Sequence, residues 1–312
     1  MKLLTFAPDS QSVVRLGACI DGDKKILDIG GAYAVAFGGQ PPSWFASVAA
    51  LLAGGEPALK MTRSVVDGFT SGKHARLVYD ADGIVFHPPT GAAPKILCVT
   101  MNYASHAQAS LTKPSEEPYF FIKLPSAMTP HRAPVLRSRT SAKCDSEIEL
   151  AVIIGKRGKY ITRESAMDHV AGYTVANDFS FRDRRTLKSD PNSARLNWLT
   201  LKNLDTAAPI GPWLVTKDEL GDPYALEITL TLDNDPAERQ TGHTSGMMHK
   251  IEDLIAHASD GVTLEPGDVI LTGTPHEVAF GHERFLRGGD ILRAEISKIG
   301  ALVNPVEIEE RE

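Results

Sequence analysis

The segment Asp145–Gly155 (DSEIELAVIIG) constrains the fold and chemistry of this chain more than any other stretch. From residue 148 onward, an apolar run rich in β-branched residues ends at a glycine, which predicts a buried β-strand. Successive side chains of a strand point to opposite faces, so one face carries Ile148, Leu150, Val152 and Ile154. The other face carries Glu147 and Glu149, followed by Ala151 and Ile153.

Two glutamates on one face of a buried strand are unfavourable unless a positive charge lies between them. Oxygen ligands favour a hard divalent cation, so Glu147 and Glu149 indicate Mg²⁺, Mn²⁺ or Ca²⁺ rather than Zn²⁺. The alternative is an exposed strand end at which both carboxylates face water. This stretch alone leaves the two interpretations open.

Composition narrows the class of protein. The 312 residues suffice for one large domain, or one large and one small domain. A net charge of −6 gives no reason to expect nucleic acid or an anionic membrane as a partner. There is no apolar run of ~18 residues and no signal-peptide core, so we expect neither a membrane helix nor secretion. Three widely spaced cysteines without CxxC spacing predict reduced thiols in a cytoplasmic protein: Cys19, Cys98 and Cys144.

Residues 1–90 show no acid/base constellation, and we expect a small accessory domain. Strands are predicted at Lys2–Phe6, Val13–Ile20 and Lys25–Ile29, and helices between Pro42 and Phe69. Punctuating residues in His87–Pro94 (HPPTGAAP) predict a linker, and residues 91–312 then form the catalytic domain.

Polar and charged residues follow several predicted strands of the second part. The strand Lys95–Thr100 leads to His106, and an apolar strand ends at Lys123. The polar, proline-containing segment Leu111–Pro118 has the composition of a lid. A third carboxylate, Asp178, follows the strand Ala171–Ala176.

Further polar groups occur toward the C-terminus. Arg182–Arg185 (RDRR) is predicted to be a solvated charged turn, and Lys202 lies beyond it. In the loop after a strand at 269–272, Gly273 allows close backbone approach to a ligand, and Thr274 offers an N–H and a hydroxyl. The glycine-rich phosphate loops and the HExxH zinc motif are absent.

Taken together, these segments resemble the fumarylacetoacetate hydrolase family. The resemblance covers roughly residues 95 to 308 and rests on six blocks in the family's order: KILCVTMNYASH (95–106), EPYFFIKLPS (117–126), DSEIELAVIIG (145–155), AGYTVANDFSFRD (171–183), GPWLVT (211–216) and LEPGDVILTGTP (264–275). It implies an α+β fold, with mixed β-sheets rolled around the active site, plus a small α+β N-terminal domain. It also implies a homodimer.

The resemblance assigns roles to individual residues. It implies that Glu147, Glu149 and Asp178 bind one Mg²⁺ ion, with Mn²⁺ or Ca²⁺ as substitutes. The catalytic positions correspond to His106, Lys123 and Lys202, and the substrate-contacting threonine corresponds to Thr274.

The implied chemistry is cleavage of a C–C bond in a β-diketo acid, such as an acylpyruvate or a diketo-deoxy sugar acid. The metal acts as a Lewis acid toward the 2-oxo acid, His106 activates water, and Lys123 or Lys202 neutralises negative charge. The partner is thus a small 2-oxo or diketo acid. Decarboxylation, tautomerisation or dehydration uses the same enolate stabilisation and forms the alternative function.

The chain departs from the family at several places, one of them Leu201, where a glycine commonly precedes the second lysine. The glutamate that commonly follows the histidine by three positions is Ala109 here, which favours the alternative function. Substitutes for it are Glu116 or Glu117 on the lid, or Glu277 or Glu283 on a later loop. Arg185 replaces a common glutamine, and it either binds the substrate carboxylate or faces water. About seven residues are inserted between Arg185 and Lys202. A third interpretation is an impaired protein that binds metal and 2-oxo acids without turnover.

Overall fold

The computed structural model describes residues 1–69, 74–91, 93–109, 115–186, 189, 196–233, 235–275 and 284–310. The strands are β1 (Lys2–Ala7), β2 (Arg15–Ile20), β3 (Lys25–Asp28), β4 (Val78–Asp80), β5 (Val85–His87), β6 (Ile96–Val99), β7 (Phe120–Lys123), β8 (Met128–Thr129), β9 (Val135–Arg137), β10 (Cys144–Asp145), β11 (Ile148–Ile154), β12 (Val170–Asn177), β13 (Ser180–Phe181), β14 (Ala208–Thr216), β15 (Glu227–Leu232), β16 (Asp235–His243), β17 (Val269–Leu271), β18 (Ile291–Ile296) and β19 (Gly300–Ile308). The α-helices are α1 (Ile29–Phe37), α2 (Val48–Ala53), α3 (Gly55–Asp67), α4 (Ala104–Ala109), α5 (Trp198–Lys202), α6 (Lys217–Leu220) and α7 (Ile251–Ala258).

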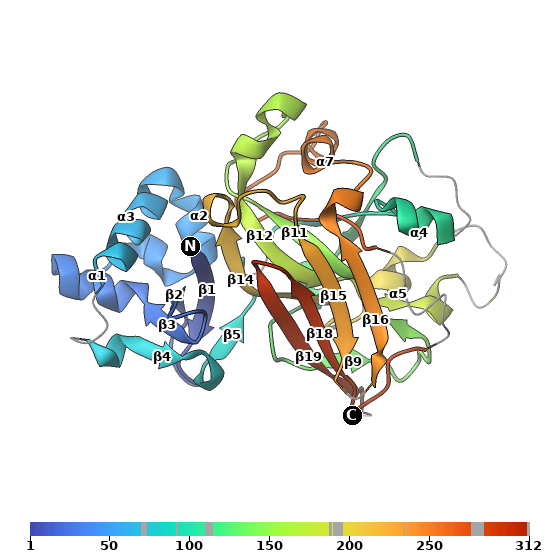
Figure 1. Ribbon diagram of the computed structural model, residues 1–312, viewed down its shortest axis with the longest axis horizontal. Coiled ribbons are helices and arrows are strands. Elements are labelled where there is room, and N and C mark those ends of the chain that lie inside the picture. The colour runs from blue at the N-terminus through green and yellow to red at the C-terminus, as the bar shows by residue number, and fades with distance from the viewer. Residues whose placement is uncertain are drawn as a thin grey trace.

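Two large sheets form the body of the molecule (Figure 1). Within the described residues, the larger sheet has twelve strands, most of them in the order β4-β3-β2-β1-β14-β12-β11-β17-β6-β7. The smaller sheet has the order β16-β15-β18-β19-β9. It lies over the middle of the larger one, where β15, β18 and β19 contact β11, β12 and β14. Parallel pairs such as β17 with β6 occur among antiparallel ones, so the predicted α+β fold with mixed sheets is confirmed.

The predicted strand after Ser146 is the central strand β11. All seven of its residues are buried, and it pairs with β12 on one side and β17 on the other. Its even-numbered side chains enter the core between the two sheets, as the alternation predicts. On the opposite face, Ala151 and Ile153 pack in two separate smaller clusters.

The N-terminal residues do not stand apart from the rest of the chain. β1 pairs with β14, with Leu3 opposite Leu214, so the N-terminal strands continue the large sheet. Helices α1 to α3 cover one face of these strands (Figure 1), and their apolar cluster includes Leu214 and Ile153 from the later part of the chain. The division at residues 90 and 91 remains a prediction, and the hydrogen bonding of the sheet crosses it.

Helix α1 is the main element that the sequence did not predict. The predicted strand to Ile29 ends at Asp28, whose carboxylate accepts a hydrogen bond from the Gly31 N–H, 3.0 Å away. This side chain caps the first turn of α1. The helix sequence IGGAYAVAF has two glycines and no polar face, which explains why periodicity missed it. Between β11 and β12, Arg163–His169 forms a 3₁₀ helix.

Among the described residues, no helix is both long enough and apolar enough to cross a bilayer.

Candidate metal and active site

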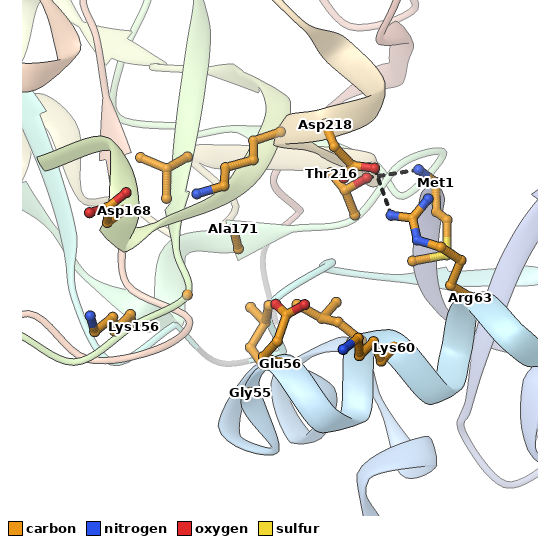
Figure 2. Close-up of a pocket in the computed structure, with 15 residues that line it drawn as sticks. Met1, Gly55, Glu56, Lys60, Arg63, Lys156, Asp168, Ala171, Thr216 and Asp218 are labelled. Carbon is orange, nitrogen blue, oxygen red and sulfur yellow. Dashed lines mark hydrogen bonds and ion pairs between the residues drawn. The ribbon is translucent and has the colours of Figure 1, made fainter. Parts of the chain in front are cut away.

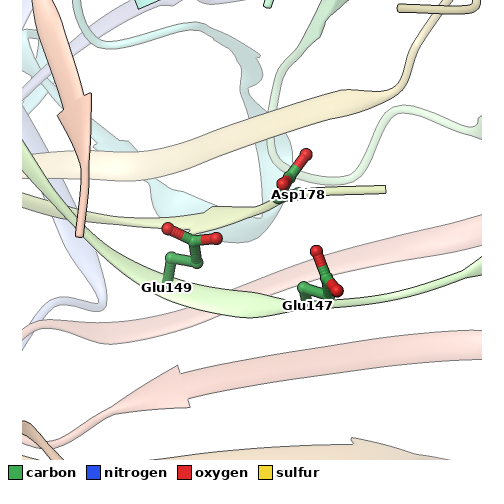
Figure 3. A group of neighbouring side chains, drawn as sticks. All are labelled: Glu147, Glu149 and Asp178. Carbon is green, nitrogen blue, oxygen red and sulfur yellow. The ribbon is translucent and has the colours of Figure 1, made fainter. Parts of the chain in front are cut away.

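The three predicted metal ligands meet inside the large sheet. Glu147 precedes β11, Glu149 lies within it, and Asp178 follows β12, the neighbouring strand. One carboxylate oxygen from each residue lies within 4.8 Å of the other two, and all three residues are buried (Figure 3). The interpretation of Glu147 and Glu149 as a water-facing strand end is therefore wrong. Three converging carboxylates form the kind of oxygen donor set that a hard divalent cation binds.

Backbone hydrogen bonds fix this arrangement. The Asp178 N–H donates to the Glu147 carbonyl oxygen at 2.8 Å, and the Glu147 N–H donates to Oδ1 of Asn177 at 2.9 Å. These bonds lock the strand ends together, so the acidic side chains project into the same space.

Lys202 and Arg182 compensate much of the buried negative charge. Nζ of Lys202 donates to Oε2 of Glu147 at 2.5 Å and also binds Oδ2 of Asp178. Arg182 binds Glu147 and donates to Oδ2 of Asp145 through Nε at 2.9 Å. The prediction that Arg182 is part of a solvated turn is wrong, because its partners Asp145 and Glu147 are buried.

The neighbouring charges set the protonation of the two glutamates in opposite directions. Burial by itself raises the pKa of Glu147, but the positive charges of Arg182 and Lys202 outweigh it and hold that pKa well below its usual value. Burial, together with the negative charges of Asp178 and Glu147, raises the pKa of Glu149 well above its usual value. For Lys202, burial opposes the charged form, yet Asp178 and Glu147 raise its pKa, so the ammonium stays protonated.

Lys123 is fully buried, and its ammonium group is surrounded by acceptors from the protein. Its Nζ donates to Oδ1 of Asp178 at 2.8 Å, to the carbonyl oxygen of Phe179 at 3.2 Å and to the carbonyl oxygen of Lys202. An ammonium group has three N–H donors, so all of them are used. In this arrangement Lys123 holds Asp178 and the end of α5 in place.

His106 lies beside the triad on α4, where its imidazole contributes to the low pKa of Glu147. Its Nδ1 is buried and has no hydrogen-bond partner among the described residues. Of the suggested orienting carboxylates, Glu116 and Glu117 are exposed, and Glu277 and Glu283 lie outside the described residues. Residues 111–114 of the predicted lid also lie outside the described residues.

The loop after β17 borders the site on the side of Glu149. The Gly273 N–H donates to Oε2 of Glu149 at 2.6 Å, and Thr274 is buried next to it. Gly273 has φ +89°, and a Cβ atom there would lie 2.8 Å from Cβ of Asn102. Asn102 in turn donates to the Thr272 carbonyl oxygen at 2.9 Å. A glycine is required at this close approach.

Arg185 lies apart from this buried cluster. Its side chain is exposed, and within the described part of the chain it forms no ion pair. This exposure fits both predicted roles of Arg185, pairing with a substrate carboxylate and facing water. Three residues that contact the site were not predicted from the sequence: Asn102, Arg182 and Gln240. Their partners in the site are far away in the sequence. The one hint in the sequence was a further acidic residue, Asp145, close to Glu147 and Glu149.

A cavity of about 510 Å³ lies elsewhere, between α3 and the strands β12 and β14 (Figure 2). Its lining includes Lys60, Lys156, Ala171 and Thr216, and Arg63 is paired with Asp218 at its edge. None of the site residues predicted from the sequence lines it, although all of them are described.

Known proteins share both the sequence and the fold. Mitochondrial oxaloacetate tautomerases are similar: that of Xenopus laevis is 38% identical over 98% of this chain and 90% of its own length, and a human one is 40% identical over 72% and 69%. Maleylpyruvate hydrolase from Sphingobium, solved with manganese and pyruvate, is 27% identical, with a TM-score of 0.76 over 99% of this chain and all of that one. Fumarylacetoacetate hydrolase from Exiguobacterium antarcticum is 28% identical, with a TM-score of 0.75 over the same shares.

The family model of the fumarylacetoacetate hydrolase C-terminal domain matches residues 95–307, which is more than half of the chain. That match begins just before β6 and ends within β19, and it contains the three carboxylates, His106, both lysines and Thr274. The chain therefore belongs to the fumarylacetoacetate hydrolase family.

Proposed function

We propose that this protein is a divalent-metal-dependent tautomerase that interconverts the keto and enol forms of a 2-oxo dicarboxylic acid of the oxaloacetate type. The observation that carries the proposal is His106 beside a buried carboxylate triad, with no described partner on Nδ1. Without an orienting carboxylate, His106 is a poorly held base for activating water, whereas tautomerisation needs no activated water. Similar proteins named as oxaloacetate tautomerases also support a tautomerase. The sequence alone favoured a hydrolase.

The donor set fits a hard divalent cation at Glu147, Glu149 and Asp178, with Mg²⁺ or Mn²⁺ as the first choices and Ca²⁺ as a third. When bound, such a cation supplies Lewis acidity toward the 2-oxo group and makes enolisation easier.

We assign proton transfer, charge stabilisation and substrate positioning to residues of the chain. His106 takes a proton from C3 of the keto form, the C3–H pair becomes the C2=C3 double bond, and the same proton is returned to the C2 oxygen. Lys202 carries a fixed positive charge that stabilises the negative charge developing on that oxygen. Lys123 keeps Asp178 in position. Gly273 lets the loop backbone approach closely while its N–H holds Glu149, and Thr274 offers its hydroxyl to the substrate carboxylate. We assign Arg185 to the distal carboxylate, since its exposed guanidinium is free to pair bidentately.

A second candidate is the hydrolysis of a β-diketo acid such as an acylpyruvate. The similar maleylpyruvate hydrolase, whose structure contains manganese and pyruvate, supports it. Hydrolysis requires a carboxylate on His106, and Glu277 and Glu283 stay candidates for that role.

Measuring which products the metal-loaded protein forms distinguishes the tautomerase from the hydrolase. Metal-loaded protein is given oxaloacetate, with deuterium exchange at C3 and the enol absorbance as readouts, and separately an acylpyruvate, with pyruvate as product. Tautomerisation that is lost in His106→Ala without pyruvate release supports the proposal. Metal-dependent pyruvate release, or CO₂ from oxaloacetate, replaces it with hydrolysis or decarboxylation. Binding without any turnover would indicate the impaired protein.

We further propose a homodimer and retain the cytoplasmic location predicted from the sequence. The similar vertebrate tautomerases are named as mitochondrial, so fractionation of the native host's cells is the deciding measurement.

A further inference from the structure

Gln240 connects the small sheet to the active site. It lies on β16, its residue is 2% exposed, and its side-chain amide makes three hydrogen bonds. Nε2 donates to Oγ1 of Thr274 at 2.7 Å and to the carbonyl oxygen of Pro275 at 2.9 Å. Oε1 accepts from the N–H of Ile148 at 3.3 Å. Ile148 lies between two of the metal ligands, so this one amide spans the metal strand and the substrate loop.

The chemistry of the partners determines the orientation of the amide. The Pro275 carbonyl can only accept a hydrogen bond, and the Ile148 N–H can only donate one. Nε2 must therefore face Pro275 and Oε1 must face Ile148, and the reverse orientation would place like groups together. Since Nε2 can only donate, the Thr274 hydroxyl has to accept from it.

This bond directs the Thr274 proton. A hydroxyl has one hydrogen to donate and two lone pairs to accept with. Within the described residues, no acceptor for the Thr274 hydroxyl is found, so its hydrogen remains available to a group that enters the site.

The surrounding loop holds Thr274 against the metal strand. Thr272 donates through Oγ1 to the Leu150 carbonyl at 2.9 Å, and Gly273 donates to Glu149. On the outer side, β16 approaches so closely that a Cβ atom on Gly242 would lie 2.5 Å from Cβ of Pro275. Gln240 therefore reaches the loop across a tightly packed contact.

We infer that Gln240 is a positioning residue that makes Thr274 a hydrogen-bond donor to the carboxylate of a bound 2-oxo acid. The inference rests on the proposed function of the site, because it requires an anionic substrate there. A bond to a charged acceptor is worth more than a neutral one, so its loss weakens substrate binding about tenfold or more.

A double-mutant cycle tests the inference with Gln240→Met, Thr274→Val and their combination. The readouts are the Kd of oxalate for the Mn²⁺-loaded protein, measured by calorimetry, and KM and kcat for oxaloacetate. We expect Gln240→Met to raise the oxalate Kd and KM about tenfold. It should have little further effect when Thr274 is already valine. Thr274→Ser keeps the hydroxyl and should remain sensitive to Gln240→Met.

Two further variants separate this role from packing. Asn304 is an equally buried amide far from the site that donates to the carbonyl oxygens of Pro130 and Ala133 at 2.9 and 2.8 Å. Asn304→Leu should lower the melting temperature without changing the oxalate Kd. Gln240→Asn replaces Gln240→Met if the latter does not fold, because its shorter amide cannot reach both partners.

The outcomes are distinct. An unchanged oxalate Kd in the Gln240 variants, or effects of Gln240→Met and Thr274→Val that simply add, overturns the inference and leaves the proposed function intact. If the Mn²⁺-loaded parent protein binds no oxalate, the 2-oxo acid site itself is wrong, and the inference falls with it.

Discussion

The ammonium group of Lys202, the last residue of α5, lies 2.5 Å from Oε2 of Glu147 and also binds Asp178. All three side chains are buried. Two of the three triad carboxylates therefore share one lysine. Removing that lysine breaks two buried ion pairs and leaves Glu147 only Arg182, and Asp178 only Lys123, as a positive partner. Breaking a buried pair by removing one partner typically costs about 3–5 kcal/mol.

Lys202→Met should lower the stability of the metal-free protein by about that amount, and Mn²⁺ should restore more of it than in the parent protein, because the cation then supplies the missing charge. Thermal unfolding with EDTA and with Mn²⁺ measures both quantities. Lys25→Met is the matched control: its pair with Asp80 is exposed to water, so we expect little or no loss of stability. Equal losses in the two variants would contradict the buried role.

Glu149→Gln should weaken Mn²⁺ binding at least about tenfold and leave the fold intact. The amide oxygen of glutamine can still accept the Gly273 N–H, so the loop keeps its contact while one anionic ligand is lost. Calorimetric titration with Mn²⁺ gives the affinity. Glu265→Gln, at a half-buried carboxylate that pairs with Arg157 outside the triad, serves as control. Undiminished Mn²⁺ affinity in Glu149→Gln would exclude Glu149 as a ligand.

His106→Ala should reduce tautomerisation of oxaloacetate by about 10²- to 10⁴-fold, the usual contribution of a general acid–base group. Mn²⁺ affinity should change little, since the three carboxylates remain. C3 deuterium exchange, followed by NMR at saturating Mn²⁺, measures the rate. If His257→Ala, a control on α7, loses as much activity as His106→Ala, the effect is not specific to the site.

His131 should make the fold sensitive to acid. Burial, with the nearby charges of Arg132 and Arg293, lowers the pKa of His131 to about 3, and its Nδ1 accepts from the Val303 N–H at 3.0 Å. The unfolded chain binds a proton here below about pH 6.5, whereas the folded chain does not until about pH 3. Stability from this group is therefore complete above pH 6.5 and is lost as the pH falls, by up to about 1.4 kcal/mol per pH unit.

Urea unfolding between pH 7.5 and pH 4.5 tests this expectation. His131→Gln keeps an acceptor for Val303 but does not titrate, so its stability should fall less steeply with decreasing pH than that of the parent protein. Parallel curves for the two proteins would assign the acid sensitivity to other groups.

The fragment 91–312 should not fold as a soluble monomer, although the sequence predicts a domain boundary there. Without β1, the edge of β14 and the buried face of Leu214 become exposed. Circular dichroism and size-exclusion chromatography of the fragment provide the measurement. A folded, monomeric fragment would establish the boundary as a true domain limit.

Local pattern predicted much of the site because its three carboxylates lie on a strand or directly next to a strand end. The alternation in β11 placed Glu147 and Glu149 on one face, and the strand before Asp178 placed a third carboxylate at a strand end. Both inferences need only the two-residue period of a strand. The same local reasoning gave a wrong prediction for Arg182. A charged turn is usually solvated, but the burial of Arg182 depends on its ion pairs with Asp145 and Glu147, which are 37 and 35 residues away in the sequence.

Most strands near the site, the acidic strand and the family could be predicted from the sequence, because these depend on neighbours within a few positions and on ordered motifs. Helix α1 could not, and neither could the way in which charges and hydrogen bonds are shared, which became visible in the folded chain. All three N–H donors of Lys123 are used by Asp178 and two carbonyl oxygens, and Gln240 on the smaller sheet donates to Thr274. A side chain's role depends on which donors and acceptors remain unpaired, and pairing between strands that are distant in sequence determines which ones those are.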